Sequence, residues 1–294
     1  KHFVDGPIVV SSLSQTPGRN LLVGALGRGG KGVFGLDVTS PSGFGASNAL
    51  WELRDDGGDM GHVIGEPLIV TLNDAARTRA VLVPNGINST NGNAVLFVID
   101  VLTGELLKKI DTGVGADNAL FDPRGRDVDN NGTVDYVYAG ERHANLRKFR
   151  LAGDTPASWV LGASGQPLYR TRTGQPITSG LAIARNPMDN KPWVYFGTGS
   201  YMTLGDASDM TIQTLYGIID ENATLTEADL QPRDIAATQE YNGLTYRVFE
   251  RTAPLPAGKK GWFLDWDNPT AGGRMVVRPQ MRGGEVGDMV VGAH

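Results

Sequence analysis

The sequence predicts an all-β protein of the β-propeller class, and three observations support this prediction. A strand, a Gly-containing turn and a second strand ending near Asp recur from Leu21, Val81, Tyr136 and Val194, at spacings of 60, 55 and 58 residues. The 40 Gly and 16 Pro are spread through 294 residues without a collagen-like period, which suits short strands joined by tight turns. Each unit has room for four strands, the content of one propeller blade.

Candidate strands outside the repeated pairs complete the units. After each of the first three pairs comes a segment with a large apolar or aromatic residue, at 49–53, 105–110 and 166–170. A further segment leads into the next repeat, at 65–72 and 177–185. Roughly five units of this kind fit the chain, and blades bury their faces against neighbouring blades. The alternative is a pair of β-sandwiches, which would not require the units to resemble one another.

The two ends and one insertion complete the expected domain. KHFVDGPIVV (1–10) is expected to hold the inner strand of a first blade, and RMVVRPQMRGGEV (274–286) the start of a last pair. Segment 221–260 is expected to be an insertion at a blade edge, with a short helix over ENATLTEADL. We expect residues 1–294 to form a single propeller domain, taken from a longer protein because residue 1 is Lys and not Met.

Composition excludes several classes of function. The absence of Cys excludes disulfides, thiolate catalysis and zinc–sulfur sites. A formal charge of −5 without a Lys/Arg cluster gives no electrostatic footprint for nucleic acid or anionic membrane. No apolar run approaches the ~20 residues of a transmembrane segment. No G-x-S-x-G elbow points to a nucleophilic hydrolase.

The run DVDNNGTVD (127–135) predicts a calcium site. Its oxygen ligands would be the side chains of Asp127, Asp129, Asn131 and Asp135 and the carbonyl of Thr133. Gly132 allows the sharp turn that points them inward, and the spacing follows the first half of an EF-hand loop. The twelfth position is Tyr138 and not Glu, so the loop must close at Asp135. A flexible ring of five oxygens suits Ca²⁺ better than Mg²⁺.

A polar turn is the alternative interpretation of this loop, since turns select Asp, Asn and Gly. Three carboxylates within nine residues would repel one another without a cation, and a turn needs only one of them. The loop is expected between two blades, directly before the strand YVYAG (136–140). Calcium binding would then order segment 121–135 and couple it to that strand.

Other polar and aromatic residues have simpler interpretations. Strand-end aspartates are read as turn formers, and these are Asp37, Asp100 and Asp220. The five Trp are expected to pack between blades and not to form a cofactor platform, and they are Trp51, Trp159, Trp193, Trp262 and Trp266. The four His (His2, His62, His143 and His294) lack ligand-like spacing. Asp206 and Asp209 could bind a second cation, but a polar loop is the preferred interpretation.

Several segments resemble the C-terminal propeller of the PilC/PilY family, the calcium-binding, tip-associated adhesins and biogenesis factors of bacterial type IV pili. The most specific are GRGGKGVFGLDVT (27–39) and DVDNNGTVDYVYAG (127–140), and FVDGPIVV, LWEL and FGTGSYMTLGDASDMTIQTLYGIID extend the resemblance over most of residues 3–220. The family's calcium ligands match the five ligand positions named above. The resemblance implies a modified, quinoprotein-like propeller, seven-bladed in the family and incomplete in this chain.

The chain departs from the family pattern after YVYAG. Where the family usually has Asp, a Gly-Asn-Leu-Trp run and Phe-Asp-Leu, this sequence has Glu141, then Ala144 and Arg147 in HANLR, and Arg150 in FRL. These changes concern blade packing and a surface, and the calcium positions are retained.

The resemblance also implies a function. It implies an extracytoplasmic protein at the pilus tip, cell surface or outer membrane of a Gram-negative bacterium, with pilin or minor pilins and a host or abiotic surface as partners. Calcium would regulate pilus extension or retraction and attachment, and the chain would not be an enzyme. One alternative is a scaffold propeller for outer-membrane assembly. Another is a quinone-dependent dehydrogenase, which would need adjacent cysteines and calcium ligands drawn from several blades.

Overall fold

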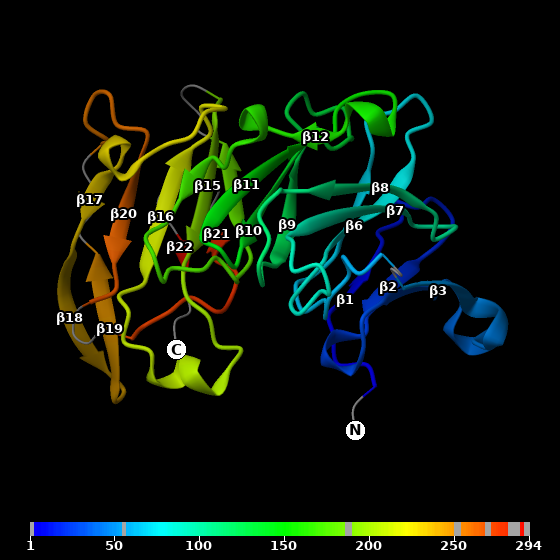
Figure 1. The fold of residues 1–294 in the computed structure, drawn as a ribbon, viewed down its shortest axis with the longest axis horizontal. Helices are drawn as coiled ribbons and strands as arrows, with labels where there is room; N and C mark the ends of the chain where they lie inside the picture. The colour runs from blue at the N-terminus through cyan, green and yellow to red at the C-terminus, as the bar shows by residue number, and fades with distance from the viewer. Residues whose placement is uncertain are drawn as a thin grey trace.

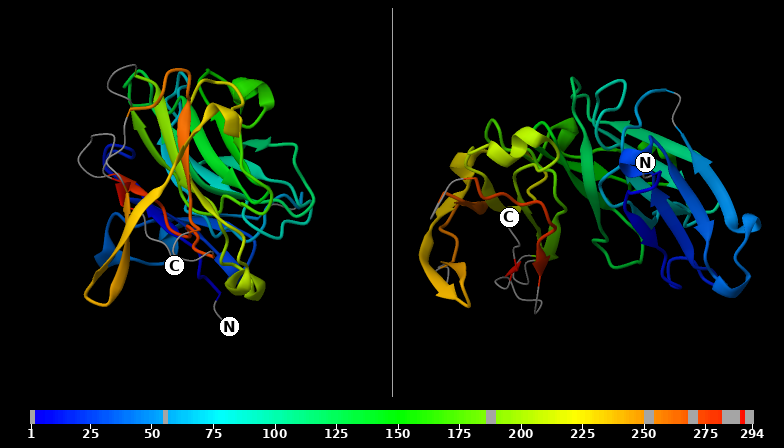
Figure 2. Two further views of the ribbon diagram at one scale, coloured as in Figure 1. Left: turned by 90° about the vertical axis from the view of Figure 1, so that its left-hand side faces the viewer. Right: turned by 90° about the horizontal axis from the view of Figure 1, so that it is seen from below.

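The computed structural model describes residues 3–54, 57–185, 190–249, 254–267, 272–281 and 289–290. Four mainly antiparallel sheets follow one another along the chain and lie side by side in an arc, as Figure 1 and Figure 2 show. The first strands of successive sheets are neighbours, β1 with β5, β5 with β9 and β9 with β14. This is the arrangement of propeller blades, and over the described residues the ring is not closed.

The first two blades are four-stranded sheets in chain order. The first contains β1 (Ile8–Val10), β2 (Leu21–Ala25), β3 (Val33–Asp37) and β4 (Ala49–Leu53). The second contains β5 (Leu68–Thr71), β6 (Arg79–Pro84), β7 (Val95–Asp100) and β8 (Leu106–Asp111). Both follow the predicted strand pairs and flanking strands.

The third and fourth blades are more elaborate. The third contains β9 (Leu120–Arg126), β10 (Tyr136–Glu141), β11 (Asn145–Arg150) and β12 (Val160–Leu161), with β13 (Tyr169–Arg170) also paired to β11. The fourth has the order β14 (Ala182–Arg185), β15 (Pro192–Gly197), β16 (Thr214–Ile219), β20 (Gly261–Asp265) and β17 (Gln231–Arg233), with β17 parallel to β20. The insertion thus supplies one strand to the fourth blade.

The remaining elements are short. A hairpin of β18 (Ile235–Tyr241) and β19 (Leu244–Phe249) extends from the fourth blade (Figure 1), and β21 (Gln280–Met281) pairs with β22 (Met289–Val290). All helices of the described residues are short 3₁₀ helices, namely η1 (Gly27–Gly29), η2 (Pro41–Gly43), η3 (Ala46–Asn48), η4 (Pro156–Ser158), η5 (Ala163–Gly165), η6 (Leu204–Ser208) and η7 (Glu227–Asp229). The short helix expected at 221–230 is η7. Thr226 and Asp229 form a capping box at its N-terminus. No helix in the described part of the chain is long and apolar enough to cross a membrane.

The cores lie mainly between blades. One cluster joins strands of the first and second blades, and a second cluster joins the second and third, including Leu72, Val134 and Leu151. Such clusters form because each sheet has two faces to bury and only a neighbouring blade to bury them against. Burying one side chain of this size contributes about 1.5–3 kcal/mol.

Trp51 and Trp159 pack in clusters that join blades, as expected of all five Trp, whereas Trp193, Trp262 and Trp266 pack in clusters drawn from residues 182–275 of the fourth blade and its insertion. Trp51 on β4 of the first blade donates its indole N–H to the carbonyl of Val101 in the second blade, at 2.9 Å. Its ring lies over Gly104, where an added Cβ would come within 2.5 Å of Trp51 Cγ. The outer edges of these two blades therefore meet around one aromatic ring.

Two departures from the family pattern contact each other. Glu141 and Arg147 form a buried ion pair of 2.6 Å, with side-chain exposures of 0% and 3%. Asn118 and Asn145 donate further hydrogen bonds to the same carboxylate, at 3.1 and 2.6 Å. Ala144 has a φ of +63°, a region that favours the glycine of the family pattern.

The substitution Gly104→Ala tests the contact between the first two blades. Gly104 has a φ of +75° and no room for a Cβ, whereas Gly113 has a φ of +73° and no atom within 4 Å of its would-be Cβ. Both alanines carry the backbone cost of about 1–2 kcal/mol. Gly104→Ala should lower the free energy of unfolding by about 1–3 kcal/mol more than Gly113→Ala in chemical denaturation. Equal losses would show that Trp51 does not hold the blades together.

Candidate functional site

The acidic loop 127–135 lies inside the third blade, where it joins β9 to β10. The expectation that it lies between two blades in sequence was wrong, because residues 120–126 already form the innermost strand of the same sheet. Segment 121–126 is therefore paired with β10 within the sheet. Pro123, Gly125 and a β-bulge opposite Tyr138 and Gly140 concealed this strand in the sequence.

Three of the predicted ligands come together in the loop. One carboxylate oxygen from each of Asp127, Asp129 and Asp135 lies within 4.8 Å of the others. Two oxygens bound to one Ca²⁺ at about 2.3–2.6 Å can be no more than about 5.2 Å apart. The three oxygens therefore lie close enough together to share a single calcium ion.

Hydrogen bonds within the loop fix its turn. Asp127 accepts the backbone N–H of Asn131 at 3.2 Å and that of Gly132 at 2.7 Å, and Asp129 accepts the N–H of Asn131 at 3.1 Å. Gly132 has a φ of +84°, as the sharp turn requires. The backbone thus folds around the first two carboxylates.

The other two predicted ligands lie in the same turn. The side-chain oxygen of Asn131 accepts the N–H of Thr133 at 2.8 Å and also accepts its hydroxyl. Since an amide oxygen has two lone pairs, Asn131 would have to release the Thr133 hydroxyl to bind an ion. Thr133 itself is 2% exposed.

The second blade also contacts the loop, and sequence reasoning missed this. Asn73 Nδ2 donates to Asp135 Oδ1 at 3.1 Å, and Arg77 Nη2 donates to the carbonyl of Asn131 at 3.0 Å. Both residues lie in the turn between β5 and β6, 54 to 62 positions earlier in the chain. The repeat is the one sequence signal that could have indicated these contacts, because it places the turn between β5 and β6 beside the next blade.

A cleft of about 1030 Å³ opens among loops of all four blades. Three arginines and three aspartates line it, namely Arg28, Arg142, Arg170, Asp117, Asp206 and Asp209. Arg28 Nη2 spans from the first blade to the carbonyl of Met202 in the fourth at 2.9 Å, and Arg142 pairs with Asp117 at 2.7 Å. These six side chains carry three positive and three negative charges.

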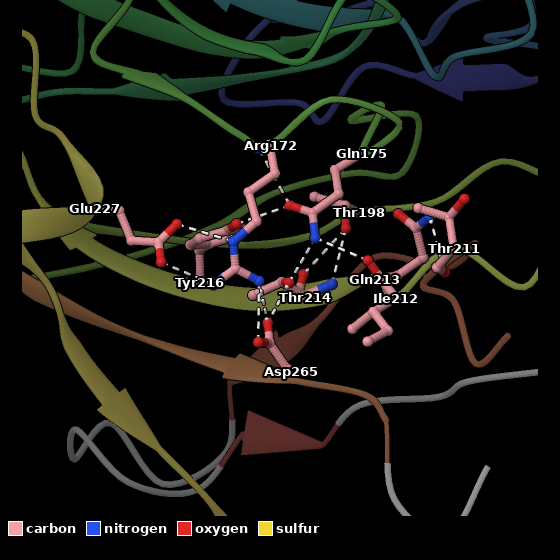
Figure 3. A network of polar contacts seen from close by, with 10 residues as sticks. All are labelled: Arg172, Gln175, Thr198, Thr211, Ile212, Gln213, Thr214, Tyr216, Glu227 and Asp265. Atoms are coloured by element: carbon pink, nitrogen blue, oxygen red, sulfur yellow. Dashed lines mark hydrogen bonds and ion pairs between the residues drawn. The ribbon is translucent and has the colours of Figure 1, made fainter. Parts of the chain in front are cut away.

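A polar network supports the cleft between the third and fourth blades (Figure 3). Arg172 donates to both oxygens of Asp265 at 2.8 and 2.9 Å and to both oxygens of Glu227 at 2.8 and 2.9 Å. The contact with Glu227 raises the pKa of Arg172 above its usual range and lowers the pKa of Glu227. The guanidinium also lies 5.0 Å from the ring centre of Phe263.

The network continues through side-chain amides and hydroxyls (Figure 3). Tyr216 donates to Gln175 Oε1 at 2.8 Å, Gln175 Nε2 donates to the hydroxyl of Thr214 at 2.7 Å, and that hydroxyl donates to Asp265 at 2.6 Å. Burial raises the pKa of Tyr216 to about 12, so it remains a neutral donor. These contacts connect Arg172 and Gln175, which lie between the third and fourth blades in the chain, to strands β16 and β20 of the fourth blade.

Asp206 caps the loop between β15 and β16. Its carboxylate accepts the hydroxyls of Ser200 and Thr203, both at 2.6 Å, and the N–H of Met202 at 2.7 Å. Partial burial opposes its ionisation, but these hydrogen bonds outweigh burial and hold the pKa of Asp206 well below its usual range. Among the described residues, no group of three or more potential metal-ligating side chains includes Asp206 or Asp209, which favours the polar-loop interpretation over a second cation site.

The histidines show no metal cluster among the described residues. His62 and His143 line the cleft, and His62 Nδ1 lies 2.8 Å from the carbonyl oxygen of Gly27. His2 and His294 lie outside the described residues.

Fold and site together define an open β-propeller with an acidic, oxygen-rich loop in one blade. Residues 1–235 match the family model of the PilY1 beta-propeller domain, and the chain belongs to this family. It is 35% identical over 312 residues to a Type IV pilus biogenesis factor PilY1 homolog of Xylella fastidiosa, with 97% of this chain and 21% of the relative covered. It is 32% identical over 331 residues to the Type IV pilus biogenesis factor PilY1 of Pseudomonas aeruginosa, with 97% and 28% covered.

A solved structure shares the fold. The crystal structure of the Pseudomonas aeruginosa PilY1 C-terminal domain matches with a TM-score of 0.83 and 30% identity, over 95% of this chain and 65% of that chain. This confirms the predicted propeller class and the family resemblance. The chain spans between about a fifth and just over a quarter of the length of the two curated relatives.

The substitution Asp206→Ala should reveal the capping role through pH. Because the folded pKa of Asp206 is depressed, its contribution to stability is present above the unfolded value of about 3.9 and is lost as pH falls toward the folded pKa. Asp206→Ala should lower the free energy of unfolding by about 1 kcal/mol at pH 7. The difference from the parent protein should shrink between about pH 4 and pH 2 in denaturation experiments. A difference independent of pH would exclude the ionised cap.

Proposed function

We propose that this chain is the calcium-binding propeller domain of a type IV pilus biogenesis factor. Family membership and the names of the relatives support the pilus role. The observation that carries the calcium assignment is the trio of carboxylates in loop 127–135, with oxygens within 4.8 Å of one another. The proposed location is extracytoplasmic, at the pilus tip, cell surface or outer membrane of a Gram-negative bacterium.

The chemistry of the loop supports calcium as the ion. Asp127, Asp129 and Asp135 would bind through carboxylates, Asn131 through its amide oxygen and Thr133 through its carbonyl. All five are hard oxygen donors, which Ca²⁺ binds in variable geometry. A bound divalent ion would neutralise the mutual repulsion of the carboxylates.

The proposed role is regulatory and non-enzymatic. Calcium binding would stabilise the third blade and the surface it presents to pilin or minor pilins, and so regulate pilus extension, retraction and twitching motility. The same surface would contribute to attachment to host or abiotic surfaces. The names of the relatives as biogenesis factors support this role over catalysis.

Two other functions fit the chain less well. A quinone-dependent dehydrogenase would draw calcium ligands from several blades and usually has adjacent cysteines, whereas the carboxylates lie on one loop and the chain has no Cys. A general scaffold propeller would have no use for the acidic loop.

Calorimetric titration of calcium into single variants tests the site. Asp127→Ala and Asp135→Ala should each abolish measurable binding, because each removes a charged ligand. Asp209→Ala, an acidic residue on a loop of the fourth blade, should bind like the parent chain. Undiminished binding in both loop variants would disprove the site.

A binding assay tests the proposed role. The chain should retain minor pilins from the same organism on an affinity resin in the presence of calcium and release them with chelator. Asp135→Ala should retain little in either condition. Equal retention with and without chelator, in both the parent chain and the variant, would show that the interaction with minor pilins does not depend on calcium.

A further inference from the structure

The acidic loop is joined to the second blade along a defined seam, by which we mean the contact of residues 71–78 with loop 127–135. The N–H of Val134 donates to the carbonyl of Thr71 at 2.8 Å, and Leu72 forms a parallel bridge with Val134. Val134 and Leu72 both belong to the hydrophobic core between these blades. The end of the loop is thus part of an interblade core.

Asn73 holds a proposed metal ligand from across this seam. Asp135 is 8% exposed, and its two carboxylate oxygens accept from different blades. Oδ1 accepts from Asn73 Nδ2 at 3.1 Å, and Oδ2 accepts from the N–H of Val128 at 2.8 Å. Two donors fix the rotation of the carboxylate, so Asp135 is oriented before any ion binds. Outer-shell hydrogen bonds of this kind orient ligands and tune metal affinity.

Arg77 adds another polar contact across the seam. Arg77 has a φ of +50° and donates to the carbonyl of Asn131. Beside the loop, a groove of about 260 Å³ separates Asp127 and Thr133 from Thr71. The loop and the second blade are therefore not packed together along their full length, and individual hydrogen bonds matter.

We propose that Asn73 is a positioning residue of the calcium site, and that ion binding stabilises the seam between the second and third blades through Asp135 and Val134. This inference rests on the proposed calcium function. Coupling is reciprocal, because a contact that favours ion binding is itself favoured by the bound ion. Calcium would then stabilise the contact between the second and third blades, in addition to ordering one loop.

Calcium titration of Asn73→Ala tests the positioning role. Binding should weaken by about 10- to 100-fold, as outer-shell substitutions do. Thr78→Ala is the matched control, because it removes the hydroxyl bond to Asp74 in the same turn, at 2.6 Å, and no contact with Asp135. Thr78→Ala should bind calcium like the parent chain. Unchanged affinity in Asn73→Ala would overturn the assignment.

Hydrogen exchange tests the seam itself. In the parent chain, calcium should slow amide exchange at Val134 and in residues 71–79 of the second blade, and Asn73→Ala should reduce this protection. Protection confined to 127–133 would overturn the coupling and leave calcium binding intact. No calcium effect anywhere, together with no heat of binding in the parent chain, would instead refute the proposed function.

Discussion

The whole structure depends on the burial of each sheet against the next. A blade of four strands has two faces that carry apolar side chains. A sheet with both faces exposed to water is not stable, so each face must be buried against another element. The clusters that join the first to the second and the second to the third blade supply this burial. They also bring residues far apart in sequence, such as Asn73 and Asp135, to hydrogen-bonding distance. The acidic loop is therefore located by blade packing as much as by its own sequence.

Electrostatics adds a second requirement within this frame. The carboxylates of the loop are held close together by backbone N–H groups, which partly offset their repulsion. Elsewhere, some charged groups have direct partners of opposite charge, as Arg172 has in Glu227 and Asp265. Among the described residues, the loop is the place where three carboxylates gather within 4.8 Å of one another, and this is the observation on which the proposed divalent-ion site rests.

The sequence predicted much of this, and the limits have physical causes. Strands β6 and β7 carry continuous apolar runs and were found, whereas β9 contains Pro123 and Gly125 and was taken for a loop. The three aspartates were found because one turn holds them all. Asn73 was not predicted, because its role depends on a contact with Asp135 in the next blade. The sequence around Asn73 contains no pattern that indicates this distant contact.

The buried pair of Glu141 and Arg147 limits where segments of two family members can be joined in a chimaera. Each residue replaces a different type in the family pattern, and each has the other as its partner at 2.6 Å. Replacing either one alone would leave an uncompensated charge in the interior, at a cost of about 3–5 kcal/mol. The residue types at the two positions are therefore coupled. A chimaera that crosses between these strands at residues 142–146 and takes the Trp of the family pattern at 147 would leave the carboxylate of Glu141 without its guanidinium partner, even when both parents fold well.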